Sequence, residues 1–194
     1  MNVTQHRIIL ASASPRRREL LGQAGVDFEV IVSGCDETPI PQESPREMVE
    51  RLALSKAAAV ADQHPEAFVI GADTTVFIDG ISLGKPESES EAHDMLARIA
   101  GRAHEVWGGI AIAQRAKKIN QVWSHVTQVT MAAMTKAEIE RYVRTGEPMD
   151  KAGAYAIQGI GLQFVDTVQG SYSNVVGLNI CALMERLKKC GAVR

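Results

Sequence analysis

The stretch IILASASPRRRELL, residues 8–21, contains the signals for a buried strand followed at once by a helix. Four apolar residues come first, as in a strand that is covered on both faces. Ser14 then suits the N-cap of a helix, and Pro15 suits its first helical position. Gly25 suits the C-terminal end, so the pattern predicts a helix over residues 15–24.

Three arginines, Arg16 to Arg18, occupy the first turn of this helix. The helix N-terminus carries roughly half a positive elementary charge, which disfavours each cation by roughly a few tenths of a kcal/mol. A bound anion would reverse this effect, because backbone amides and guanidinium groups would both favour it. By contrast, the helix predicted to begin at Ser44 has a capping box in which Glu47 supplies negative charge. The first helix therefore predicts a phosphate site.

The composition is typical of a globular chain, with 45% hydrophobic and 23% charged residues. A length of 194 residues fits one or two domains, and we expect a single domain over residues 1–194. The net charge is −2, so the arginine cluster is local and nucleic acid is not an expected partner. The sequence contains no P-loop, dinucleotide-binding glycine motif, nucleophile elbow or zinc-protease motif.

The cysteines Cys35, Cys181 and Cys190 are odd in number and widely spaced. This pattern fits neither a disulfide framework nor a zinc ribbon, and it is typical of a reducing compartment. The sequence also shows no signal peptide and no apolar run that is long enough to span a membrane. We therefore expect a cytoplasmic protein that does not bind membranes.

Strand and helix patterns follow one another without a strict alternation. Strands are predicted at 67–78, 106–113, 122–133, 154–158 and 162–168, and a final helix at 178–189. This order predicts an α/β fold with a mixed sheet flanked by helices and with a cleft.

Asp73 lies within an apolar strand whose side chains are hydrophobic on both faces. An unpaired carboxylate there would destabilise the fold by several kcal/mol, so it requires a metal, a cation or hydrogen-bond donors. A functional role is favoured over a purely structural one. Gly71, two residues earlier, is interpreted as a place where a ligand approaches the backbone.

Two lysines are candidate phosphate ligands. Lys56 follows Met48 and Leu52 at helical spacing, so it lies on their apolar face. Spacing alone fits a lysine at the edge of that face as well as a phosphate contact. Lys85 stands between Gly84 and Pro86 and, taken alone, is an ordinary exposed loop lysine.

Other polar residues have the chemistry for metal or base recognition. Glu37, or its neighbour Asp36, could join Asp73 in holding Mg²⁺ or Mn²⁺ through carboxylate oxygens. Gln158 carries an amide that can donate to and accept from a base edge, although a polar strand end explains it equally well.

Seven blocks of residues, in order along the chain, resemble those of the Maf-type nucleoside triphosphate pyrophosphatases. The blocks are Ser12–Arg17, Asp36–Thr38, Glu50–Ala57, Gly71–Thr74, Gly84–Pro86, Lys151–Tyr155 and Gly170–Leu178. The resemblance covers essentially the whole chain. It implies an α/β fold with two lobes around a nucleotide-binding cleft, similar to the inosine triphosphatases.

The resemblance also implies an activity, namely hydrolysis of a nucleoside triphosphate to the monophosphate and pyrophosphate with a divalent metal. The combination Gly-Ala-Asp-Thr with Ile-Gln-Gly is similar to the branch that acts on dTTP and UTP. By this resemblance Asp73 is the catalytic residue, as proton acceptor or metal ligand, and Glu37 is a metal ligand. The implied substrate-binding residues are Ser12, Arg16, Arg17, Lys56, Thr74, Lys85 and Gln158.

Three further expectations accompany the resemblance. A homodimer is plausible for the family. A nucleotide-binding regulator of cell division, without significant turnover, is the alternative function. Asn179 stands where the family usually has proline, and we expect it to weaken the start of the last helix.

Overall fold

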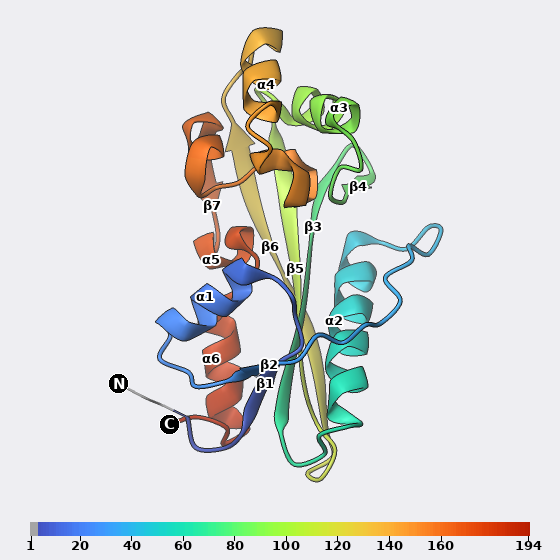
Figure 1. Ribbon diagram of the computed structural model, residues 1–194, viewed down its shortest axis with the longest axis vertical. Helices are drawn as coiled ribbons and strands as arrows, with labels where there is room; N and C mark the ends of the chain where they lie inside the picture. The colour runs from blue at the N-terminus through green and yellow to red at the C-terminus, as the bar shows by residue number, and fades with distance from the viewer. Residues whose placement is uncertain (1–3) are drawn as a thin grey trace. The chain divides into compact units, whose positions relative to one another are not determined.

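A seven-stranded mixed sheet organises the computed structural model, which describes residues 4–194 (Figure 1). The strands are β1 (Ile8–Leu10), β2 (Glu29–Val30), β3 (Phe68–Ile78), β4 (Ile81–Leu83), β5 (Ala103–Gln114), β6 (Ile119–Met131) and β7 (Val165–Gln169). Their order is β2-β1-β3-β5-β6-β7, with β4 paired to β3 off this path. β1 runs parallel to β2 and β3, whereas the β3–β4 and β6–β7 pairs are antiparallel. The predicted α/β class with a mixed sheet is confirmed.

Six α-helices and three short 3₁₀ segments are found in the described part of the chain. The helices are α1 (Pro15–Gln23), α2 (Pro45–Ala61), α3 (Glu89–Ile99), α4 (Lys136–Val143), α5 (Tyr172–Val176) and α6 (Ile180–Lys189). The 3₁₀ segments are η1 (Glu147–Asp150), η2 (Ala152–Ala154) and η3 (Gly159–Phe164). Within residues 4–194, no helix combines the length and the apolar character that crossing a membrane requires.

The chain divides into two compact units. The first unit comprises the residues up to Asp73, Gly108–His125 and Gly177–Arg194, and the second comprises Thr74–Trp107 and Val126–Val176. The long strands β3, β5 and β6 contribute residues to both units. The single domain expected over residues 1–194 stays a prediction.

In the first unit, β1, β3 and β5 are covered on both faces. Ile9, Val69 and Ala111 lie in one core layer with the small residues of α2, and Leu10 and Ile70 lie in the opposite layer with α6. Figure 1 shows α2 and α6 on opposite sides of these strands. Apolar residues on both faces therefore correctly predicted buried strands.

Gly71 serves helix packing, and its interpretation as a ligand approach point is wrong. A Cβ at this position would lie 2.0 Å from the carbonyl oxygen of Ala53 and 2.7 Å from the amide of Ala57. The backbone of α2 fills that space. Gly109 on β5 has the same role, since its Cβ would lie 2.1 Å from the carbonyl oxygen of Val49. Two glycines thus let α2 lie directly on the sheet.

The helix starts agree with the sequence patterns at Ser14 and Ser44. The Ser14 hydroxyl accepts from the Arg17 amide, and Ser44 and Glu47 form the expected capping box. The expectation for Asn179 is wrong, because its side chain caps α6 by accepting from the Ala182 amide at 3.2 Å. An Asn at the N-cap stabilises a helix start rather than weakening it.

The second unit has its own core, in which α3 and α4 pack against the parts of β3, β5 and β6 that belong to this unit. Its buried side chains include Tyr142 of α4, Leu96 of α3 and Val129 of β6, which belong to one apolar cluster. The strand predicted at 154–158 is wrong, since this segment is irregular between η2 and η3. The strand predicted at 162–168 begins only at Val165, because η3 occupies the preceding residues.

Candidate functional site

Lys56 of α2 links two carboxylates in the first unit. Its Nζ donates to Asp73 Oδ1 at 2.8 Å and to Glu37 Oε2 at 2.9 Å. The Lys56 side chain is 8% exposed and that of Asp73 is 12% exposed, whereas Glu37 is 58% exposed. The interpretation of Lys56 as a lysine at the solvent edge of the helix is therefore wrong. Of the metal, cation or hydrogen-bond donors that the sequence predicts for Asp73, the structure shows a cation, Lys56.

The packing of α2 on β3 explains why these two groups meet. Gly71 and Asp73 are two residues apart on β3, so their side-chain positions lie on the same face of the strand. Ala53 and Ala57 approach that face at Gly71. Lys56, adjacent to Ala57, is thereby brought against the Asp73 carboxylate.

Arg17 of the first helix points inward. Its guanidinium donates to the carbonyl oxygens of Gly177 and Ala72, each at 2.9 Å, and to the Ser12 hydroxyl at 3.2 Å. Burial lowers the pKa of Arg17, and the charges of Asp73 and Glu37 oppose that decrease. Arg17 therefore carries positive charge at this helix start, as predicted. The carbonyl oxygens of Gly177 and Ala72 and the two acids already stabilise much of that charge.

Of its two neighbours, only Arg18 differs from Arg17 in exposure, since Arg17 is itself half-buried. Arg18 is exposed and Arg16 is half-buried. Ser12 is buried, and besides Arg17 it accepts a hydrogen bond from the Ser14 amide at 3.2 Å. Ser12 therefore fixes both the start of α1 and the Arg17 guanidinium.

The loop that carries Glu37 is tied to α2 at a second point. Arg51 forms a two-pronged ion pair with Glu43, at 2.6 and 2.7 Å. Asp36 is engaged locally, since its Oδ1 accepts from the Thr38 amide at 2.9 Å and from the Thr38 hydroxyl at 2.5 Å. Those bonds lower the pKa of Asp36. Of the two loop acids, Glu37 is the one that lies beside Lys56.

The donor set near Asp73 suits a hard divalent cation. Within residues 4–194, no three His, Cys, Asp or Glu side chains gather closely enough to form a metal site of their own. Mg²⁺, however, is commonly bound by one or two carboxylates together with water and substrate phosphates. Asp73 and Glu37 supply two carboxylates that converge on one ammonium group, so they fit such a partial site.

Thr74, Lys85 and Gln158 belong to the second unit. Thr74 directly follows Asp73 on β3 and is half-buried. Lys85 is exposed in a loop that is held by a hydrogen bond from the Gly153 amide to the Gly84 carbonyl oxygen, 3.0 Å long. Gln158 is the N-cap residue of η3, so its interpretation as a polar strand end is wrong.

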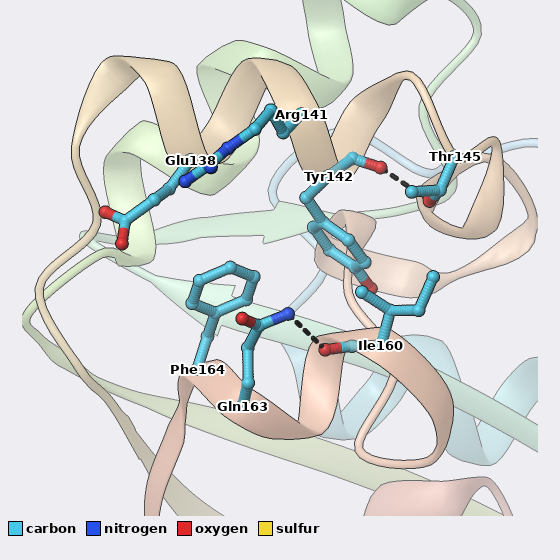
Figure 2. A pocket seen from close by; sticks show the side chains of 7 residues that line it. All are labelled: Glu138, Arg141, Tyr142, Thr145, Ile160, Gln163 and Phe164. Atoms are coloured by element: carbon cyan, nitrogen blue, oxygen red, sulfur yellow. Dashed lines mark hydrogen bonds between the residues drawn. The ribbon is translucent and has the colours of Figure 1, made fainter.

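A cavity of about 280 Å³ lies in the second unit between α4 and η3 (Figure 2). Its lining residues are Glu138, Arg141, Tyr142, Thr145, Ile160, Gln163 and Phe164. None of the residues predicted to bind substrate lines it. Glu147, which contacts Tyr142 and Ile160, was not among the sequence candidates, because its partners are mainly backbone amides that leave no residue-type signature.

Similarity to known proteins identifies the family. Residues 7–190 match the family described as Maf-like protein. The chain belongs to the Maf family. The dTTP/UTP pyrophosphatase of Pelotomaculum thermopropionicum is 50% identical over 184 residues, which cover 95% of this chain and 96% of that protein. The dTTP/UTP pyrophosphatase of Desulfotalea psychrophila is 48% identical over 93% of this chain and 92% of its own length. The resemblance inferred from the seven motif blocks is thereby confirmed.

Proposed function

We propose that this Maf protein hydrolyses dTTP and UTP to the corresponding monophosphate and pyrophosphate. Relatives with that name share about half of its residues over nearly the full chain length. The observation that carries the proposal is the buried Lys56–Asp73 pair with Glu37 and Arg17 beside it. This cluster combines cations that attract a triphosphate with carboxylates that suit a metal ion and water.

The chemistry assigned to these residues is hydrolysis of the bond between the α- and β-phosphates. The water oxygen forms a new bond to phosphorus, the bridging oxygen leaves with pyrophosphate, and the proton of the water passes to a base. Asp73 serves either as that base or as a metal ligand, with Glu37 as the second ligand. Bound Mg²⁺ or Mn²⁺ would neutralise phosphate charge and polarise the reacting groups. Phosphoryl transfer depends mainly on such positioning and charge neutralisation.

Cationic side chains are assigned to the phosphates. Lys56, Arg17 and Lys85 would supply positive charge, and Ser12 would orient Arg17. When a triphosphate and a metal ion bind, Lys56 can exchange part of its contact with the acids for a phosphate oxygen. We further propose that Arg16, Thr74 and Gln158 govern the choice of base.

The test is product analysis with purified protein, dTTP or UTP, and Mg²⁺ or Mn²⁺. Release of pyrophosphate and the monophosphate in equal amounts is expected. Orthophosphate as the sole inorganic product would refute the assigned bond. Tight nucleotide binding without turnover under either metal would instead favour a nucleotide-binding regulator. A cytoplasmic location and a homodimer stay predictions.

A further inference from the structure

Glu147 is the centre of a hydrogen-bond network in the second unit. Its Oε1 accepts from the Tyr142 hydroxyl and from the Gly161 amide, each at 2.8 Å. Its Oε2 accepts from the Ile160 amide at 2.9 Å. Figure 2 shows the Tyr142 ring pointing from α4 toward Ile160 of η3. One carboxylate at the start of η1 thus joins α4 to the first turn of η3.

This carboxylate replaces the usual N-cap of η3. The first amides of a helix lack partners within the helix, and the side chain of the N-cap residue normally accepts from one of them. Gln158, the N-cap residue here, makes no such bond with its side chain. Because Glu147 accepts from the backbone amides of Ile160 and Gly161 instead, the side-chain amide of Gln158 is not needed for capping.

The geometry of Gly159 is matched to Glu147. A Cβ at Gly159 would lie 2.4 Å from Glu147 Oε2, and the backbone there has a φ of 81°. On the other side of the turn, the Ile160 carbonyl oxygen accepts from Gln163 Nε2 at 3.0 Å (Figure 2). The turn that follows Gln158 is therefore held at both its amide and its carbonyl groups.

Glu147 is charged at neutral pH. Burial acts to raise its pKa, but the hydrogen bonds from Ile160, Gly161 and Tyr142 together hold the pKa below its usual value. Hydrogen bonds to a charged acceptor are about twice as strong as those between neutral groups. The network is thus suited to fixing a short turn that has little regular structure of its own.

We propose that Glu147 is a positioning residue for base recognition, which holds the turn at 159–161 so that the Gln158 amide faces the nucleotide base. The proposal rests on the function proposed above. Glu147 affects which base the protein accepts. It acts through Gln158 and does not contact the phosphates.

The experiment compares Glu147→Gln with Glu140→Gln, a matched control. Glu140 lies on the exposed face of α4 in an ion pair with Arg144. A glutamine at 147 has one acceptor oxygen, so its amide nitrogen would face one of the loop amides and that bond would be lost. We expect KM for dTTP to rise about tenfold or more, with a smaller change in kcat. The preference for dTTP over dCTP and dGTP should fall, whereas inhibition by pyrophosphate, which has no base, should stay unchanged.

Two further measurements separate positioning from general loss of structure. Amide hydrogen exchange over residues 157–164 should accelerate in Glu147→Gln and not in Glu140→Gln. In a double-mutant cycle with Gln158→Ala, the double variant should match Gln158→Ala alone, because Glu147 acts through Gln158. Tyr142→Phe removes one of the three donors and should give a smaller change in the same direction, which provides a milder variant if Glu147→Gln folds poorly.

The outcomes distinguish this inference from the proposed function. If wild-type protein releases pyrophosphate but base preference is the same in Glu147→Gln, the positioning role is wrong and the function stands. Additive effects of the Glu147 and Gln158 substitutions would also overturn it. If wild-type protein hydrolyses no nucleotide, the proposed function fails and this inference fails with it.

Discussion

The substitution Gly71→Ala tests how the site is assembled. The added Cβ would lie 2.0 Å from the Ala53 carbonyl oxygen and 2.7 Å from the Ala57 amide, whereas ordinary contacts begin at 3.4 Å. Both neighbours are backbone atoms of α2, so rotation of a side chain cannot relieve the overlap. The helix must move away from β3 by more than about 1 Å, a typical response to overpacking that destabilises a core by roughly 1–3 kcal/mol.

The same movement would separate Lys56 from Asp73, which are now 2.8 Å apart. A displacement of about 1 Å at reacting groups can reduce turnover by roughly 100-fold. We therefore expect Gly71→Ala to lower both the free energy of unfolding and kcat for dTTP. Urea denaturation followed by tryptophan fluorescence, and a pyrophosphate-release assay, measure the two effects.

Gly22→Ala is the matched control, because a Cβ at this α1 position meets no atom within 4 Å. Alanine is favoured over glycine in a helix by roughly 0.5–1 kcal/mol, so this variant should be as stable as wild type or more so. Gly109→Ala should behave like Gly71→Ala, since its Cβ would meet the Val49 carbonyl oxygen at 2.1 Å. A Gly71→Ala protein with wild-type stability and turnover would refute the direct packing of α2 on β3.

Three further predictions concern stability. Lys56→Met leaves the buried Asp73 carboxylate without its ammonium partner and should lower the free energy of unfolding, measured by urea denaturation, by roughly 3–5 kcal/mol. The control Lys189→Met removes an exposed ion pair and should change it by less than about 1 kcal/mol. Burial lowers the pKa of His104 from 6.5 to about 4, so the fold favours the neutral ring. His104 therefore contributes up to about 3 kcal/mol of stability above pH 6.5, and this is lost as pH falls from 6.5 through 4. His104→Gln, which keeps a hydrogen-bond partner for the Tyr155 hydroxyl now 2.8 Å away, should remove this pH dependence, and an unchanged slope of stability against pH would contradict the assignment. Asn179→Ala removes the α6 cap and should destabilise by about 1 kcal/mol in thermal melts, whereas no change would show that the cap is unimportant.

Local signals in the sequence were sufficient for much of the fold. Ser14 and Ser44 begin helices because their hydroxyls accept from amides only three residues away. The buried position of Asp73 was also predictable, since apolar residues on both faces of a strand require cover on both sides. Such signals involve neighbours along the chain.

The structure differs from the sequence predictions where contacts join segments that are distant along the chain. Nothing in the strand that contains Gly71 reveals that α2 lies against it, so the strand alone suggests a ligand at that position. The sequence predicts a strand that ends at Gln158, because the acceptor that shapes its turn, Glu147, is eleven positions earlier in the sequence. The spacing of Lys56 predicts that it lies on the apolar face of α2. Whether it reaches solvent at the edge of that face or forms a buried ion pair depends on Asp73, which β3 supplies.

Pyrophosphate release by Asp73→Asn and Asp62→Asn proteins, with dTTP and Mg²⁺, is the most direct test of the catalytic role proposed for Asp73 and its partner Lys56. Asp62 is an exposed acid at the end of α2, paired with Arg115, so its variant controls for the loss of one carboxylate. Loss of a base or of a metal ligand at the reacting centre should reduce turnover by about 100-fold or more in Asp73→Asn, with Asp62→Asn unaffected. An Asp73→Asn protein that releases pyrophosphate at the wild-type rate would mean that the Lys56–Asp73 pair only stabilises the fold.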